Sequence, residues 1–413
     1  MWQRLLFIIY TFGIHLGNFF IYSNKFLNNK INQLYKGRRD TLNRIRSNNP
    51  PKNNPIWIHC ASLGEFEQGR PLIEAIKSTY PDEKIILSFF SPSGYEIRKN
   101  YPYADEIIYL PSDLPENNRR LLEYYNPKIL ILVKYEFWWN LIREVQQKHI
   151  PIISISGVFR DNDYFLKQFV KPFRNLLIHF EMIFVQDEAS EKVLSERNFH
   201  NVEIAGDTRI DSVLNNLNKN PAPKRIHAFV QGKKTIIYGS VWLSDIHMAI
   251  GVMQAFPDYK HIIVPHDVRP ENIDNLRRWI TDDSRLYSES DDNTDVLIID
   301  NIGMLSSLYA VADYVYIGGG FRRGIHNILE PLIYRIPVFF GPKYNKFNEA
   351  VTLNEQESVF PVRKCDEMIA IINQWEGDTV FRDTVKTSIE MYFEQNRGAT
   401  HKILDYLKQI IEI

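Results

Sequence analysis

The chain has 413 residues, of which 44% are hydrophobic and 24% charged, so it can bury a large core and is not an intrinsically disordered polymer. Its length favours two domains, and its formal net charge of −1 argues against a nucleic-acid partner bound through a basic surface. Cys60 and Cys365 are too few for a disulfide framework or a thiolate-rich zinc site, which favours a reducing compartment.

The amino-terminal end differs from the rest of the chain in charge and hydropathy. Residues 1–50 contain eight Lys and Arg and one Asp. Leu5–Asn24 contains no charged side chain, is rich in Leu, Ile, Phe and Tyr, and is long enough to span a bilayer. No small-residue cleavage site follows, so we expect a retained anchor that spans the membrane or lies in its interface, with the basic cluster on the cytoplasmic side. An ordinary buried helix with a solvated basic turn is the alternative.

Short apolar runs alternate with longer amphipathic segments after residue 50, which is typical of repeated βαβ units with buried parallel strands. We expect crossover helices at 67–80 and 137–149. Strands are predicted at 56–59, 85–90, 106–110, 129–133, 151–156, 182–186 and 202–206, and in the second half at 235–240, 261–265, 296–300, 314–319 and 337–341.

A polar, proline-containing stretch at 215–224 has the composition of an interdomain linker. Together with the strand pattern, this stretch predicts an α/β chain. An amino-terminal segment would cover 1–49, and two doubly wound, Rossmann-like domains over 50–218 and 219–413 would face each other across a cleft. Ligands of such sheets bind beyond the carboxyl ends of the strands, so the chemistry is expected in the residues that follow each run.

The first predicted strand ends in His59-Cys60-Ala61-Ser62-Leu63-Gly64-Glu65, ahead of a helix expected to begin near Glu67. A carboxylate that projects from such a turn can act as a general base on an alcohol. From the local sequence alone, a charge that merely favours the helix dipole is the better explanation of Glu65.

Three turns in the second half have the composition of phosphate sites. Gly318-Gly319-Gly320 precedes a helix expected to present Asn327 and Glu330 on one face, where they would meet phosphate and ribose hydroxyls. Ser240 follows another strand, and His266 and Arg269 follow a third. Tight packing, a plain loop and a surface turn are the respective alternatives. Asp161-Asn162-Asp163 is interpreted as a polar loop and not as a metal site.

The ordered set of motifs resembles the 3-deoxy-D-manno-octulosonic acid (Kdo) transferases, which add Kdo from CMP-Kdo to the lipid A precursor during lipopolysaccharide biosynthesis. The resemblance extends over nearly the whole chain. It rests on IWIHCASLGE, SPSGYEI, YLPSDLP, VKYEFWWN, VQDEAS, IAGDTRID, YGSVW, GGGFRRGIHNILEP and VFFGPKYNKFNEA.

This resemblance implies a GT-B fold and an inverting transfer that needs no metal and no cofactor, since CMP-Kdo is a substrate. The first domain would bind the acceptor and the second CMP-Kdo, at the cytoplasmic face of the inner membrane, whose lipids the amino terminus contacts. Glu65 corresponds to the general base, which reverses the local interpretation. The positions that match donor-binding residues are Ser240, Gly319, Gly320, Asn327, Glu330 and, facing cytosine, Gly303 and Met304.

The chain departs from the family pattern at two cationic positions. An arginine common in relatives is absent beside His266, which leaves His266 and Arg269 as candidates to replace it. Arg209 stands where a lysine is common and is a candidate for charge stabilisation.

Phe137, Trp138 and Trp139 would either meet acyl chains or pack in the core. A GT-B transferase that uses a UDP-sugar and a non-catalytic membrane-bound nucleotide or glycolipid sensor remain the alternative functions.

Overall fold

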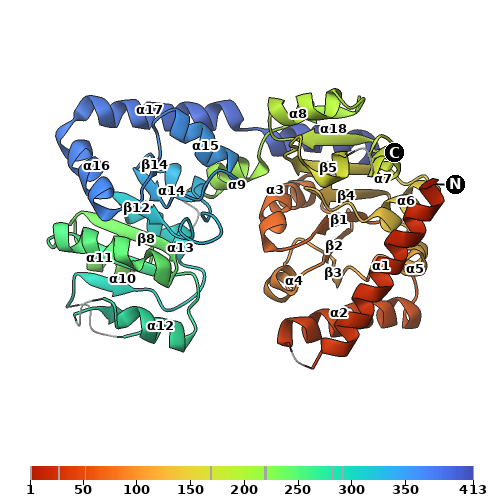
Figure 1. The fold of residues 1–413 in the computed structure, drawn as a ribbon, viewed down its shortest axis with the longest axis horizontal. Helices are drawn as coiled ribbons and strands as arrows, with labels where there is room; N and C mark the ends of the chain where they lie inside the picture. Colours follow the sequence, from red (N-terminus) through yellow and green to blue (C-terminus); the bar gives the residue numbers. More distant parts are fainter. Residues whose placement is uncertain are drawn as a thin grey trace. The chain divides into compact units, whose positions relative to one another are not determined.

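A computed structural model of the chain describes residues 2–26, 28–51, 53–167, 170–217, 221–280, 283–289 and 293–412 (Figure 1). The middle of the predicted linker, residues 218–220, lies outside the described residues. The chain divides into two compact units: residues 1–212 with 397–413, and residues 213–396.

The first unit is built on a parallel seven-stranded sheet in the order β3-β2-β1-β4-β5-β6-β7. All seven predicted runs form its strands, and the central ones are apolar because both of their faces are buried. The strands are β1 Ile56–Cys60, β2 Ile85–Phe89, β3 Glu106–Tyr109, β4 Ile129–Val133, β5 Ile152–Gly157, β6 Met182–Val185 and β7 Val202–Ile204.

Alternate strand residues feed two apolar cores, one on each face of this sheet. Trp57 and Leu130 belong to one core, and Ile56 and Ile129 to the other. Both predicted crossover helices are present, as α3 and α6. The helices of this unit are α1 Trp2–Asn24, α2 Asn29–Ser47, α3 Leu63–Thr79, α4 Pro92–Arg98, α5 Pro115–Tyr125, α6 Trp139–Gln147, α7 Lys171–Leu177, α8 Glu188–Ser195 and α18 Ala399–Ile411, with α9 Thr208–Asn216 crossing into the second unit.

The second unit repeats the design with a parallel sheet in the order β10-β11-β9-β8-β12-β13-β14. The five predicted strands are confirmed. The pattern missed β10 and β14, which are edge strands of two residues each and too short for a periodicity. The strands are β8 Thr235–Val241, β9 Lys260–Pro265, β10 Arg285–Leu286, β11 Val296–Ile298, β12 Tyr314–Ile317, β13 Val338–Phe340 and β14 Phe360–Pro361.

Most helices of the second unit connect consecutive parallel strands. They are α10 Lys224–Val230, α11 Ile246–Ala255, α12 Pro270–Arg277, α13 Leu305–Leu308, α14 Leu329–Leu332, α15 Asn348–Glu355, α16 Cys365–Gly377 and α17 Thr379–Asn396.

The carboxyl terminus belongs to the first unit, whereas the sequence division assigned it to the second domain. Helix α18 places Ile403, Leu404 and Leu407 in the core that also contains residues of α3. Asp211 accepts hydrogen bonds from the backbone N–H groups of Gly398 and Thr400 (2.6 Å each), which fixes the start of the returning segment. A linear linker signal cannot reveal such a return.

Both sheets have a topological switch point, where consecutive connections leave in opposite directions. In the first unit it lies between β1 and β4, and in the second between β8 and β12. The carboxyl ends of these strand pairs are the expected ligand positions in open α/β sheets. The SLGE turn follows β1, and the triple-glycine turn follows β12.

Candidate active site

Glu65 lies at the switch point of the first sheet. It stands in the first turn of α3, because the helix begins at Leu63 and not near Glu67 as predicted. Ser62 caps this helix: its Oγ accepts a hydrogen bond from the backbone N–H of Gly64 (3.2 Å) and donates one to the carboxylate of Glu65. The carboxylate is half-buried, and the hydrogen bond from Ser62 holds it in the first turn of the helix.

Sequence reasoning missed a polar network around the same strand end. The buried ring of His59 accepts a hydrogen bond at Nε2 from Trp138 Nε1 (3.0 Å), while Nδ1 lies 2.8 Å from Ser88 Oγ. Trp138 Nε1 is also 3.1 Å from a carboxylate oxygen of Glu136. The network joins the ends of β1, β2 and β4, and an isolated histidine in the sequence gave no signal for it.

Cys60, at the end of β1, is excluded as a nucleophile. Burial raises the pKa of its thiol, and the nearby carboxylates of Glu65, Glu136 and Glu67 raise it further. A protonated thiol is a poor nucleophile, and Cys60 Sγ is packed against α3, since a Cβ on Gly69 would lie 3.2 Å from it. The residue therefore serves packing.

The aromatic stretch after β4 belongs largely to the core. Phe137 and Trp139 are 6% and 4% exposed and pack among Phe7, Phe173 and Phe165. The idea that these two meet acyl chains is wrong, because the loop after β4 turns them inward to cover the sheet. Trp138 is half-buried and stacks on Phe90 (ring centroids 4.7 Å apart).

Asp245 ties together the two loops at the switch point of the second sheet. It is 1% exposed, and its Oδ2 accepts from the backbone N–H groups of Trp242 (2.9 Å) and Gly319 (3.1 Å). Its Oδ1 accepts from the hydroxyl of Tyr316 (3.1 Å), whose pKa is raised by burial and by this carboxylate. The sequence did not single out Asp245, since an acid in the turn Leu243–Asp245 resembles an ordinary surface residue.

The glycines after β12 are required by close packing of backbone on backbone. A Cβ on Gly318 would lie 2.4 Å from the carbonyl oxygen of Ser240, and one on Gly320 would lie 2.6 Å from backbone atoms of Gly341. Gly319 has a left-handed φ of +94°. The packing alternative considered for these glycines therefore has direct support, and the same contacts fix the loop that follows.

An aromatic stack lies beside these glycines. The rings of Trp242 and His266 are 4.3 Å apart, and those of His266 and His326 are 4.4 Å apart. Trp242 Nε1 donates to His326 Nε2 (3.2 Å), and Ser240 Oγ lies 2.8 Å from His266 Nδ1. Burial lowers the pKa of His266 and lowers that of His326 to about 4, so both rings are neutral at pH 7.

Two arginines proposed from the sequence as phosphate-binding or charge-stabilising residues form ion pairs with neighbouring carboxylates. Arg269 Nε contacts both carboxylate oxygens of Asp267 (3.0 and 2.9 Å), and another of its nitrogens lies 3.1 Å from Glu271. Arg209 forms the same kind of two-pronged pair with Asp207. Each of these arginines is thus largely neutralised by its own loop.

Asn327 and Glu330 are brought together, but not on a helix face as predicted. Helix α14 begins only at Leu329, so Asn327 lies two residues before it, and its Oδ1 accepts a hydrogen bond from the Leu329 N–H (3.0 Å). Asn327 Nδ2 donates to Glu330 Oε1 (3.0 Å). Gly303, with φ +100°, and Met304 form the turn before α13, beyond the carboxyl end of β11. The donor-site candidates of this unit thus lie at or beyond the carboxyl ends of β8, β9, β11 and β12, with Ser240 among the final residues of β8 itself.

Comparisons with known proteins identify the family. A family model described as 3-deoxy-D-manno-octulosonic-acid transferase (kdotransferase) matches residues 36–212. A 3-deoxy-D-manno-octulosonic acid transferase of Haemophilus influenzae is 27% identical over 391 residues, 88% of either chain. One of Aquifex aeolicus is 27% identical over 77% of this chain and 85% of its own. The chain belongs to the Kdo transferase family. It is therefore a glycosyltransferase.

Other relatives of this Kdo transferase show where the likeness is partial. A bifunctional glycosyltransferase/methyltransferase of Fusobacterium nucleatum is 29% identical over 83% of this chain, and the match spans only 55% of that relative. A putative UDP-N-acetylglucosamine 2-epimerase from Listeria monocytogenes (TM-score 0.60, 10% identity, 88% of this chain and 97% of that one) and a glycosyltransferase from Rickettsia africae (0.59, 13%, 87% and 99%) share the fold. The Kdo transferase thus has the predicted GT-B-like architecture.

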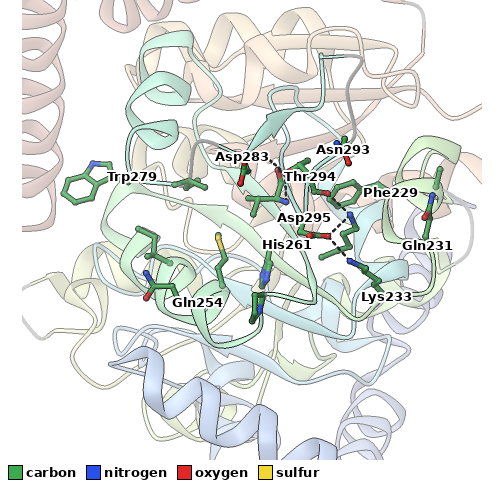
Figure 2. Close-up of a pocket in the computed structure, with 17 residues that line it drawn as sticks. Phe229, Gln231, Lys233, Gln254, His261, Trp279, Asp283, Asn293, Thr294 and Asp295 are labelled. Atoms are coloured by element: carbon green, nitrogen blue, oxygen red, sulfur yellow. Dashed lines mark hydrogen bonds and ion pairs between the residues drawn. The ribbon is translucent and has the colours of Figure 1, made fainter.

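A large cavity of about 1050 Å³ is shown in Figure 2, and none of these candidates is among the residues that line it. It is lined by Lys233, Lys260 and Asp295, which stand at or just before the amino ends of β8, β9 and β11. Its lysines are already paired, because both contact the carboxylate of Asp295 (3.1 and 2.9 Å). Ligands of open parallel sheets bind at the carboxyl ends of the strands, so this cavity lies at the edge of the sheet where a ligand is not expected.

Proposed function

We propose that this Kdo transferase moves Kdo from CMP-Kdo to a lipid A precursor of the lipid IVA type, with inversion and without a metal ion, at the cytoplasmic face of the inner membrane. The observation that carries the proposal is the half-buried carboxylate of Glu65, held by Ser62 at the switch point of the first sheet. Family membership supports the transferred sugar, and the resemblance of the motifs supplies the donor, CMP-Kdo.

Glu65 is the proposed general base. As the acceptor hydroxyl attacks the anomeric carbon of Kdo, its proton passes to the carboxylate of Glu65, and the bond from that carbon to the phosphate oxygen breaks with its electron pair leaving on CMP. Attack on the face opposite the phosphate inverts the configuration. The hydrogen bond from Ser62 keeps the carboxylate in one orientation, which lowers the cost of reaching the reactive geometry.

The loops beyond β8, β9, β11 and β12 are the proposed donor site. Ser240, Gly319 and Gly320 lie nearest the switch point, where a phosphate of the nucleotide is expected. Asn327 and Glu330 form a hydrogen-bonded pair that presents a carboxylate to sugar hydroxyls. Gly303 and Met304 offer backbone groups to the base. Neutral His266 presents an imidazole, hydrogen-bonded to Ser240, and Arg269 lies just beyond it.

Membrane attachment is assigned to α1, the helix long and apolar enough to cross a bilayer over Arg4–Asn24. Its outward face is a row of exposed apolar side chains that water does not favour. The row comprises Leu5, Ile8, Ile9, Phe12, Leu16, Phe19, Phe20 and Tyr22.

The opposite face of α1 is fastened to the first unit, which favours a helix lying in the membrane interface. Tyr10 donates to Asp113 (2.8 Å), Thr11 pairs with Asn140 (3.1 Å), and Asn18 accepts from Ser112 (2.5 Å). If α1 crossed the bilayer, it would separate from the first unit and these pairs would break. Each polar group of α1 left without a partner in hydrocarbon would then cost several kcal/mol. A helix in the interface keeps them and still buries its apolar row in lipid.

Part of the basic cluster remains available for anionic headgroups. Arg38 is buried and donates to Ser112 Oγ (3.2 Å), and Arg44 pairs with Glu106 (2.8 Å), so these two serve the fold. The exposed basic residues that remain on or near α1 and α2 are Arg4, Lys30, Lys36, Arg39 and Arg46.

The proposal is tested with Glu65→Gln, which keeps the size and the hydrogen bond from Ser62 but removes the base. We expect transfer from CMP-Kdo to a lipid A precursor, followed by mass spectrometry of the glycolipid, to fall by about a hundredfold or more, while CMP binding stays unchanged. Glu67→Gln is the matched control on the same helix, since Glu67 is occupied by Arg70 and Arg98. Near-normal transfer by the Glu65 variant would refute the assignment.

The same assay separates the alternatives. A transferase that uses a UDP-sugar would bind UDP in preference to CMP. A sensor that had lost turnover would bind CMP-Kdo without forming a Kdo-bearing lipid.

A further inference from the structure

The departing CMP carries negative charge on its phosphate, and a site that binds it must supply hydrogen-bond donors or cations. His266 supplies no positive charge at pH 7 because its ring is neutral. Arg269 is paired with Asp267 and Glu271, and Arg209 is paired with Asp207. The three cations nominated from the sequence are thus neutral or occupied.

Arg322 stands in a different situation. It follows β12 in the glycine loop, and its backbone N–H donates to the carbonyl of Gly319 (2.9 Å), which forms a tight turn. Its guanidinium carbon lies 4.3 Å from the centroid of the Trp242 ring, a cation–π contact. No carboxylate pairs with this guanidinium among the residues that the structure describes.

This contact bridges the two loops at the switch point of the second sheet. Trp242 follows β8, Arg322 follows β12, and Asp245 joins the same loops through the backbone N–H groups of Trp242 and Gly319. The charge of Arg322 acts on His266 at the end of β9, since it contributes to that residue's lowered pKa. The guanidinium therefore lies over the loops where a phosphate is expected.

We infer that Arg322, positioned by its cation–π contact with Trp242, is the cation that contacts the phosphate of the departing CMP in this protein. The inference rests on the proposed function. When the bond between the anomeric carbon and the phosphate oxygen breaks, the electron pair stays on that oxygen and Arg322 donates hydrogen bonds to the phosphate, while the acceptor's proton goes to Glu65. The planar guanidinium suits both the stack and a forked contact with two phosphate oxygens.

The test compares Arg322→Gln and Arg322→Lys with Arg323→Gln, a matched control one residue away whose exposed side chain has no stacking partner among the described residues. Binding of CMP, of cytidine and of CMP-Kdo is measured by calorimetry. We expect Arg322→Gln to weaken CMP and CMP-Kdo by about ten- to a hundredfold and to leave cytidine unchanged, since the lost hydrogen bonds go to a charged group. Arg322→Lys is expected to fall between wild type and Arg322→Gln.

Each outcome decides the inference. A loss for CMP-Kdo but not for CMP would place Arg322 at the Kdo carboxylate, and an equal loss for cytidine would indicate damage to the base site; either result overturns the phosphate assignment. So would an Arg323→Gln variant weaker than Arg322→Gln. Measuring UDP binding in parallel distinguishes an error in the proposed donor from an error in the role of Arg322. If the wild type binds UDP and not CMP, the proposed donor is wrong, and the role of Arg322 is then tested by its effect on UDP binding. A wild type that binds neither nucleotide overturns both proposals.

Discussion

Replacing Asp245 tests how the donor-side loops are held together. The carboxylate is buried and accepts three hydrogen bonds, two from the backbone N–H groups of Trp242 and Gly319 and one from the hydroxyl of Tyr316. In Asp245→Ala all three donors lose their partner in a site that excludes water. At about 1–3 kcal/mol for each buried donor left unsatisfied, after some rearrangement, the second unit is expected to lose about 3–6 kcal/mol.

Asp245→Asn should behave very differently, although it removes the same charge. The amide oxygen can take the place of Oδ2 and accept from both N–H groups, while the amide NH₂ donates to the hydroxyl oxygen of Tyr316. Only the charge assistance is lost, so we expect a cost of about 1 kcal/mol.

Equilibrium urea unfolding at pH 7 measures both variants, and calorimetry with CMP measures whether the loops still form a site. We expect the alanine variant to lose CMP affinity together with stability, and the asparagine variant to keep most of both. Equal stability of the two variants would refute the hydrogen-bond reasoning. Full CMP affinity in a destabilised alanine variant would show that these loops do not form the donor site.

Three further predictions follow from single features. Gly320→Ala places a Cβ 2.6 Å from the backbone of Gly341 and should cost about 1–3 kcal/mol in urea unfolding, whereas Gly377→Ala, with open space around it, should be neutral. The pKa of His326 is lowered to about 4 in the folded state, so as the pH falls the unfolded chain binds a proton at this residue before the folded chain does. The free energy of unfolding should therefore fall by about 3 kcal/mol as the pH is lowered from 6.5 to 4. Unfolding measured over this pH range should show a smaller decrease in His326→Asn. Replacing Phe12 and Phe19, 67% and 69% exposed, by Asp should weaken flotation with anionic vesicles by about a hundredfold without changing unfolding, and unchanged flotation would contradict the anchor.

The strands could be predicted because a strand that is buried on both faces has apolar side chains at successive positions, which form a continuous apolar run in the sequence. Ile129–Val133 is a run of only five residues and is rich in β-branched side chains, which favours a buried strand over a buried helix. The switch points followed from strand order, and they explain why the SLGE and triple-glycine turns lie at ligand-binding edges. Edge strands of two residues, such as β10, contain too few side chains to form a pattern.

The details of the site depended on contacts between distant segments, which no local pattern records. Arg269 and Arg322 look equally suited to bind a phosphate when read along the chain. The structure distinguishes them, because Asp267 and Glu271 neutralise the first while Trp242 positions the second. Asp245 was missed for the same reason: its partner Gly319 lies far along the sequence.

On the proposed function, the fastening of α1 explains how a soluble donor and a membrane-embedded acceptor can meet at one base. Asp113 accepts from Tyr10 of α1 and also from the backbone N–H groups of Asn140 and Leu141, which begin α6. The loop just before α6 carries Glu136 and Trp138. Trp138 donates hydrogen bonds to Glu136 and to His59 of β1, the strand that leads into the first turn of α3 with Glu65. One buried carboxylate therefore links the anchor helix to the switch-point edge of the same unit. On the proposed function, the depth of α1 in the interface sets the height of Glu65 above the lipid surface, which is where the acceptor hydroxyl must be deprotonated.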